Sequence, residues 1–367
     1  MNKYGFFSSL FLLVTLPVFA QDSAPQELME RFGLREARQA VSERTNWKPP
    51  QKVVVWGNSS RMQVLKDAHP DLQFNNVSST SELPQALKDA DVFIGRCIPA
   101  GIDSGHKLRW LMSLSVGVEN CAASDYLKNQ NTLITNVQKL SGPEIAEHAI
   151  AMMMALNRGL DAFVAAQQSS TWDRSLLPGD ETIWELEGRT VLVVGLGGIG
   201  KEVARRAHGL GMKVIATRNS RREGPTYVNY VGLADELLTL AKQADVVINT
   251  APLTEKTQGM YNAEFFKAMQ NHAYFISVGR GRSTHTDDLL AALKSGELAG
   301  AGLDVTDPEP LPADHPLWQQ PRVIITPHMA ARSEKVRDRI WTLVGENLRR
   351  YIAGEKMISE VNLDRGY

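Results

Sequence analysis

Three residues that could act on a small acid follow successive apolar runs in the second half of the chain: Arg280, Glu309 and His328. An arginine can hold a carboxylate through two parallel hydrogen bonds and polarise a neighbouring carbonyl. A histidine suits proton transfer near neutral pH, and a carboxylate beside it stabilises its charged form. Each residue alone is as well explained as a surface, turn or loop residue. Their shared position after strand-like runs predicts a site that binds a carboxylic acid and moves a proton.

A glycine-rich turn follows the apolar run Thr190–Val194 and opens a helix pattern that reaches about Leu210. Gly195, Gly197 and Gly200 form the spacing Gly-x-Gly-x-x-Gly. Such glycines permit a tight turn, a close approach of the backbone to a pyrophosphate, and close packing of the helix on the strand. The free N–H groups and the dipole at the helix N-terminus favour the phosphate charge. The turn therefore predicts a dinucleotide site.

The segment after the next strand indicates which dinucleotide binds. In an NAD site, a carboxylate about twenty residues after the glycines holds the ribose hydroxyls. Here Arg218, Asn219 and Arg221 occupy that place, and the first acid is Glu223. Guanidinium groups pair well with phosphate oxygens, so the segment favours NADP(H) over NAD(H). The alternative, a solvated basic loop, stays open.

The elements that must position these residues form two arrays of alternating strand and helix patterns. This alternation predicts an α/β fold of two doubly wound parallel-sheet domains, with the active site between them. A helix is expected over 27–40, another over 143–168, one over 286–295 ended by Gly296, and a last one over 330–353. The expected strands are Val53–Trp56, Val92–Gly95, Trp110–Leu114 and Thr132–Thr135 in the first array, and Thr190–Val194, Lys213–Thr217, Asp245–Thr250, Ala273–Val278, Ala301–Val305 and Val323–Thr326 in the second.

The predicted organisation has four parts: a signal peptide over 1–20, an extension over 21–50, a substrate-binding domain over 51–142 and 330–367, and a nucleotide-binding domain over 143–329. The signal peptide has a basic start at Lys3, an apolar run from Phe6 to Leu16 and a small-residue cleavage site at Ala20. We therefore expect export to a periplasmic or external compartment, or a cytoplasmic protein if the signal is not used. The apolar run is too short for a stable membrane anchor.

The remaining composition narrows the class of partner. A formal net charge of -1 over 367 residues gives no bias toward nucleic acid. The histidines and cysteines have no metal-ligand spacing, so no metal site is expected. Cys97 and Cys121 each follow an expected strand of the first array. In an exported protein they could form a bridge, and two unpaired thiols are the equal alternative.

The chain resembles the D-isomer-specific 2-hydroxyacid dehydrogenase family over roughly residues 51–355. The departure from the usual acid after the second strand, and the stretch Pro310–Trp318, resemble the glyoxylate/hydroxypyruvate reductase branch. The segments that carry the resemblance are Leu186–Gly200, Thr250–Thr254, Val278–Gly281, Gly302–Val305, Thr326–His328, Ser115–Glu119 and Ala146–His148.

The resemblance implies a flavodoxin-like substrate domain, a Rossmann cofactor domain and a homodimer. It implies NAD(P)H-dependent reduction of a small 2-keto acid to the D-2-hydroxy acid, with His328 as general acid, Glu309 as its partner and Arg280 on the substrate carboxylate. The alternative is a catalytically weak NAD(P)-binding sensor. The other implied contacts are the backbone amides of Val116 and Gly117 for the substrate, Gly198 and Ile199 for the pyrophosphate, Asp304 for the nicotinamide carboxamide, and Pro252 within the cofactor site.

Overall fold

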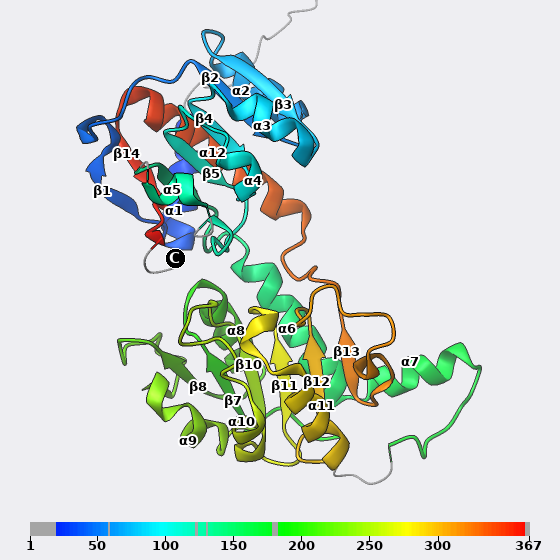
Figure 1. The fold of residues 1–367 in the computed structure, drawn as a ribbon. Coiled ribbons are helices and arrows are strands. Elements are labelled where there is room, and N and C mark those ends of the chain that lie inside the picture. Colours follow the sequence, from blue (N-terminus) through cyan, green and yellow to red (C-terminus); the bar gives the residue numbers. More distant parts are fainter. Residues whose placement is uncertain (1–19, 58, 122–123, 130, 178–182, 364–367) are drawn as a thin grey trace, which may run out of the picture.

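The computed structural model describes residues 20–57, 59–121, 124–129, 131–177 and 183–363. The signal-peptide prediction falls on residues 1–20, and 1–19 lie outside the described residues. Figure 1 shows two lobes, one above the other, each built around a parallel sheet and joined by α6 (Gly142–Asn157) and by the segment that enters α12 (Glu334–Ala353). The prediction of an α/β fold with two doubly wound sheets is confirmed.

The first sheet has five parallel strands in the order β3-β2-β4-β5-β6, which is the flavodoxin-like order. Its core also takes in the last helix, because Leu343, Val344 and Leu348 of α12 pack with Val53 and Val55 of β2. The elements of this lobe are β2 (Lys52–Trp56), α2 (Ser59–Ala68), β3 (Gln73–Val77), α3 (Leu83–Leu87), β4 (Val92–Gly95), α4 (Pro99–Ile102), β5 (Trp110–Ser113), α5 (Asp125–Asn129) and β6 (Leu133–Asn136).

The second sheet has seven parallel strands in the order β13-β12-β11-β10-β7-β8-β9, the Rossmann order with one further strand. Apolar clusters cover both of its faces, and α6 and α8 pack on one of them. Its elements are α7 (Leu160–Gln168), β7 (Thr190–Val194), α8 (Gly198–Gly209), β8 (Lys213–Arg218), β9 (Tyr230–Leu233), α9 (Leu237–Ala241), β10 (Val246–Asn249), α10 (Ala263–Ala268), β11 (Tyr274–Ser277), α11 (Thr286–Ser295), β12 (Gly300–Leu303) and β13 (Val323–Ile325).

Helix ends follow local signals where the sequence carries them. The Ser333 hydroxyl accepts a hydrogen bond from the Val336 N–H and so caps α12, four residues later than the predicted start at 330. Gly354 ends α12 and Gly296 ends α11, both in the left-handed conformation that glycine adopts without steric penalty. The predicted helix over 286–295 is confirmed.

The single helix predicted over 143–168 is wrong. The chain makes two helices, α6 and α7, bent by 74° at Gly159, whose φ of 66° lies in the left-handed region. Among the described residues no single helix is long and apolar enough to cross a membrane, and only this bent pair passes the same test of length and composition.

The helix predicted over 27–40 is only half right. The chain forms α1 (Ala20–Phe32), turns at Gly33 with φ 57°, and continues as the strand β1 (Glu36–Ala40). This strand pairs antiparallel with β14 (Lys356–Ile358). Leu28, Leu34 and Val41 are buried in the core of the first lobe, so this part of the predicted extension packs as part of that lobe. The strands β1, β3, β9 and β14 were not predicted.

Candidate active site

The glycine-rich turn has the geometry that a pyrophosphate needs. Gly195 has φ 94°, and a Cβ on Gly200 would lie 2.2 Å from the Gly195 carbonyl oxygen, so any side chain at 200 would open the turn. A Cβ on Gly197 would meet nothing within 4 Å, which leaves open space in front of the N-terminus of α8. The residues therefore fit a dinucleotide phosphate bound at the helix N-terminus.

The neighbouring backbone of the turn faces the other lobe. Ile199 packs against the apolar cluster of the second sheet, and a Cβ on Gly198 would lie 2.9 Å from Cγ of Lys139. Burial, together with the charges of Arg35 and Lys201, lowers the pKa of Lys139. Pro252 follows β10 and is exposed in the loop beside the turn. The predicted cofactor residues around the glycines thus lie on one edge of the sheet.

The arginines of the basic segment after β8 differ in their contacts. Arg218 is half-buried and donates to the Glu223 carbonyl oxygen at 2.8 Å, and Arg222 forms an ion pair with Glu236 at 2.7 Å. Asn219 is exposed. Within the part of the chain that the structure describes, Arg221 is exposed and has no ion-pair partner. Arg221 is therefore the arginine that is free to meet a phosphate.

Three neighbouring strands, β11, β12 and β13, bring the predicted catalytic residues to one edge of the second sheet. Arg280, Glu309 and His328 follow these strands in that order. Nδ1 of His328 lies 2.6 Å from Oε1 of Glu309, and the side chains are 46% and 42% exposed. A histidine held through Nδ1 by a carboxylate keeps Nε2 for another partner, so this pair can deliver a proton from the exposed ring edge.

The buried carboxylate of Asp304 fixes the segment that carries His328. It accepts hydrogen bonds from the Thr326 hydroxyl at 2.6 Å and from the Met329 and Ala330 N–H groups at 2.8 and 3.0 Å. His148 of α6 lies 2.8 Å from the same Thr326 hydroxyl. Asp304 therefore positions the segment that carries His328, and its contact with a nicotinamide carboxamide stays a prediction.

A buried amide side chain supports the backbone segment that carries Arg280. The Asn249 side chain donates to the hydroxyls of Ser277 and Ser283 at 3.1 and 3.0 Å, and Ser283 donates to the Arg280 carbonyl oxygen at 2.6 Å. The Arg280 guanidinium itself donates to the Gly279 carbonyl oxygen at 2.9 Å. These bonds fix the backbone on both sides of the arginine.

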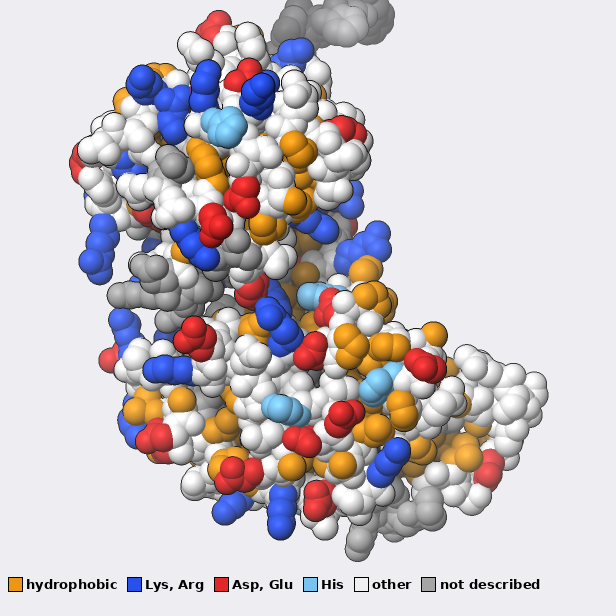
Figure 2. All heavy atoms as spheres, viewed as in Figure 1, with side chains coloured by type: hydrophobic (Ala, Val, Ile, Leu, Met, Phe, Trp, Pro, Cys, Tyr) orange, Lys and Arg blue, Asp and Glu red, His pale blue; other side chains and the backbone are white. Residues whose placement is uncertain are grey.

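The first lobe meets this edge through the loop after β5. A Cβ on Gly117 would lie 2.2 Å from Nη2 of Arg280, so only a glycine admits the guanidinium there. Asn136, at the end of β6, donates to the Val116 carbonyl oxygen at 2.8 Å and holds the loop. Nε of Arg280 donates to Oε1 of Glu119 at 3.0 Å. The predicted substrate residues of both lobes are thus in contact, and Figure 2 shows charged side chains where the lobes face each other.

The comparison with known proteins agrees with this geometry. The profile for the D-isomer specific 2-hydroxyacid dehydrogenase NAD binding domain matches residues 150–330. A glyoxylate reductase/hydroxypyruvate reductase of Mus musculus is 32% identical over 260 residues, which cover 71% of this chain and 79% of that protein. The chain belongs to the D-isomer specific 2-hydroxyacid dehydrogenase family.

Solved structures of the family share the two-lobed architecture. A D-isomer specific 2-hydroxyacid dehydrogenase family protein from Aeromonas salmonicida subsp. salmonicida A449 superposes with a TM-score of 0.74 at 29% identity, covering 86% of this chain and 99% of its own. A D-isomer specific 2-hydroxyacid dehydrogenase from Xanthobacter autotrophicus Py2, in complex with NADPH and MES, gives 0.73 at 25% identity with the same coverage. This 2-hydroxyacid dehydrogenase is thus an oxidoreductase with an NAD(P)-binding domain.

Two residues of the site in this dehydrogenase, Asn249 and Glu119, were not predicted. Asn249 carries a recognisable signal, because it is a polar residue at the end of the apolar strand β10. Glu119 belongs to the segment Ser115–Glu119, and nothing in that segment predicts its partner. Its contact joins residues 161 positions apart, and no local pattern reports such a pairing.

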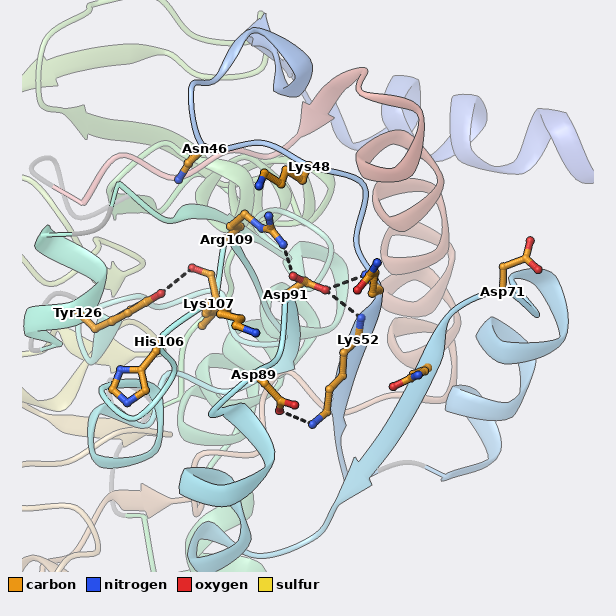
Figure 3. A pocket seen from close by; sticks show the side chains of 13 residues that line it. Asn46, Lys48, Lys52, Asp71, Asp89, Asp91, His106, Lys107, Arg109 and Tyr126 are labelled. Atoms are coloured by element: carbon orange, nitrogen blue, oxygen red, sulfur yellow. Dashed lines mark hydrogen bonds and ion pairs between the residues drawn. The ribbon is translucent and has the colours of Figure 1, made fainter.

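A polar pocket of about 840 Å³ lies elsewhere in the dehydrogenase, at the amino-terminal ends of the first sheet's strands (Figure 3). It contains none of the predicted site residues. Asp91 accepts from the Gln51 and Lys52 N–H groups and pairs with Arg109, while Lys52 pairs with Asp89. Ion pairs between residues that line the pocket therefore neutralise much of the pocket's charge. Among the described residues no group of three or more metal-ligating side chains gathers.

Proposed function

We propose that the enzyme reduces a small 2-keto acid, of the glyoxylate or hydroxypyruvate kind, to the D-2-hydroxy acid with NADPH. The observation that carries the proposal is the His328–Glu309 pair at the same sheet edge as Arg280. A relative named glyoxylate reductase/hydroxypyruvate reductase supports the substrate class.

Each protein group has a role that its position allows. Arg280 and the backbone amides of Val116 and Gly117 hold the substrate carboxylate, and the guanidinium polarises the adjacent carbonyl. Nε2 of His328 gives a proton to the carbonyl oxygen. Glu309 accepts a hydrogen bond from Nδ1–H, orients the ring and stabilises its charged form until Nε2 gives up its proton. When bound, the nicotinamide supplies the hydride.

The cofactor preference rests on the segment after β8. The N-terminus of α8 with Gly197, Gly198 and Ile199 would hold the pyrophosphate. Arg221, which is exposed, and Arg218, which is half-buried, would hold a 2′-phosphate. The Xanthobacter enzyme that is bound to NADPH supports this choice.

The test is the initial rate of NADPH and NADH oxidation by the chain from Gln21 onward, with glyoxylate, hydroxypyruvate, pyruvate and longer 2-keto acids. Removing the general acid in His328→Ala should lower kcat by about 10²–10⁴-fold and leave the Kd for NADPH unchanged. The matched control is His106→Ala, because His106 is exposed in the polar pocket away from the site. Unchanged turnover in His328→Ala would refute its role. Tight cofactor binding without turnover on any acid would favour the sensor alternative.

We also propose a homodimer that covers the α7 arm. This arm projects from the second lobe (Figure 1), and hydrophobic side chains lie on and beside it (Figure 2). Phe163, Val164 and Trp172 are 37%, 52% and 91% exposed, and exposed apolar side chains gathered in one region are typical of an interaction site. Val164→Asp with Trp172→Asp should convert the dimer to a monomer in analytical ultracentrifugation. A wild-type monomer at micromolar concentration would refute the dimer.

We propose that the mature chain begins at Gln21 and is exported. The Cys97–Cys121 disulfide supports an oxidising compartment. Cell fractionation followed by N-terminal sequencing tests this, because export predicts a periplasmic or external protein that starts at Gln21. A full-length chain confined to the cytoplasm would refute it.

A further inference from the structure

An ion pair joins the two lobes at the predicted substrate residues. Glu119 follows β5 in the first lobe, and Arg280 follows β11 in the second. Nε of Arg280 lies 3.0 Å from Oε1 of Glu119, and the two side chains are 31% and 28% exposed. The arginine that is proposed to bind the substrate carboxylate is therefore already paired with a carboxylate of the protein.

The charged groups of Arg280 and Glu119 both lie close to Gly117. A Cβ added to Gly117 would be 2.2 Å from Nη2 of Arg280 and 2.4 Å from Oε2 of Glu119. The amide of Gly117 is one of the two proposed to hold the substrate carboxylate. The carboxylate of Glu119 thus lies beside the position where a substrate would place its own.

Arg280 offers a carboxylate a side edge formed by Nε and Nη2. Nη1 donates one of its two N–H groups to the Gly279 carbonyl oxygen at 2.9 Å, and Nε with Nη2 can form two parallel bonds to one carboxylate. That edge is the one that faces Glu119 and Gly117. A substrate carboxylate that uses it must displace Glu119.

We propose that Glu119 is an internal competitor for Arg280, a carboxylate that the substrate must displace to bind. The competitor holds the guanidinium between the lobes while no acid is bound. This proposal rests on the proposed function, because it assumes that Arg280 binds the substrate carboxylate.

The loop that carries Glu119 is tied down nearby. Cys121, two residues further on, is bonded to Cys97 after β4, and the Cα atoms are 5.0 Å apart. The Asn136 side chain holds Val116 at the other end of the loop. These two contacts restrain the backbone on either side of Glu119.

The experiment measures binding of oxamate, a monocarboxylate that resembles pyruvate, by calorimetry with saturating NADPH. Half-exposed ion pairs are weak, so we expect Glu119→Gln to lower the oxamate Kd about twofold to fivefold. The KM of a reducible 2-keto acid should fall by the same factor. Glu119→Ala should act in the same direction, and Glu264→Gln, which changes an exposed carboxylate on α10, should change nothing.

The outcomes separate this proposal from the proposed function. An oxamate Kd that is unchanged or raised in both Glu119 variants would overturn the competitor, because Glu119 would then be neutral or would orient Arg280 for the substrate. Wild-type protein that binds NADPH but no oxamate would instead refute the 2-keto acid site itself. If the enzyme binds oxamate but turns over no 2-keto acid, the oxamate Kd of the Glu119 variants still tests the competitor.

Discussion

The disulfide between Cys97 and Cys121 should decide the stability of the first lobe. It joins the segment after β4 to the loop after β5, and both sulfur-bearing side chains are buried, at 8% and 0% exposure. The perturbation is Cys97→Ala with Cys121→Ala, compared with the wild-type chain before and after reduction. Reduction leaves the sequence unchanged, so it separates the effect of the bond from that of the substitutions.

The magnitude follows from the length of the closed loop. The two cysteines are 24 positions apart, and loss of the loop-closure constraint for this length is worth about 3.5 kcal/mol at 25 °C. A domain of this size loses roughly 2–4 °C of melting temperature for each kcal/mol, so the reduced protein should melt roughly 7–14 °C lower. The double alanine variant should melt lower still, because it also removes buried sulfur atoms.

The assay is a thermal melt followed by circular dichroism, with the oxidised state verified by mass spectrometry after alkylation. Because the bridge holds the loop of Val116 and Gly117, the KM for a 2-keto acid should rise on reduction while the KM for NADPH does not. A melting temperature that differs by less than about 2 °C between the oxidised and reduced wild-type protein would refute the reasoning.

Three further predictions test other parts of the structure. Gly200→Ala should lower the free energy of unfolding by about 1–3 kcal/mol and weaken NADPH binding, because its Cβ would lie 2.2 Å from the Gly195 carbonyl oxygen. Chemical denaturation measures the first effect and fluorescence titration with NADPH the second. Gly209→Ala is the control in both assays, because a Cβ there would meet nothing within 4 Å. Arg221→Ser should raise the KM for NADPH about tenfold and leave that for NADH unchanged, whereas equal effects on both cofactors would contradict the 2′-phosphate role. Burial alone would raise the pKa of Asp245, but hydrogen bonds from Thr190, His272 and Arg189 outweigh it and lower the pKa. The ionised carboxylate therefore stabilises the fold above the unfolded-state pKa of about 4, and this stabilisation is lost as the pH falls through the folded-state pKa. Asp245→Asn should be less stable than the wild type at pH 7, and its free energy of unfolding should fall less steeply as the pH is lowered. Urea titrations at several pH values measure this, and the same dependence on pH in both proteins would contradict the role of Asp245.

Much of the fold could be predicted because its signals are local. The buried strands of both sheets are short apolar runs, as expected for parallel strands covered on both faces. The strands that were missed, such as β3 and β9, lie at sheet edges, where half-exposed residues blur the pattern. The bend at Gly159 was missed because one glycine within an apolar helical pattern does not by itself predict a left-handed turn.

The sequence by itself determined the glycine turn and the three residues at the strand ends. Backbone conformation at Gly195 and the order of residues after strands are properties of short segments, and parallel strands must bring their carboxyl ends to one edge. Only the tertiary structure decided that Cys97 meets Cys121 and that Glu119 meets Arg280. Those contacts depend on how segments far apart in the chain pack together, and no period or spacing in the sequence encodes that distance.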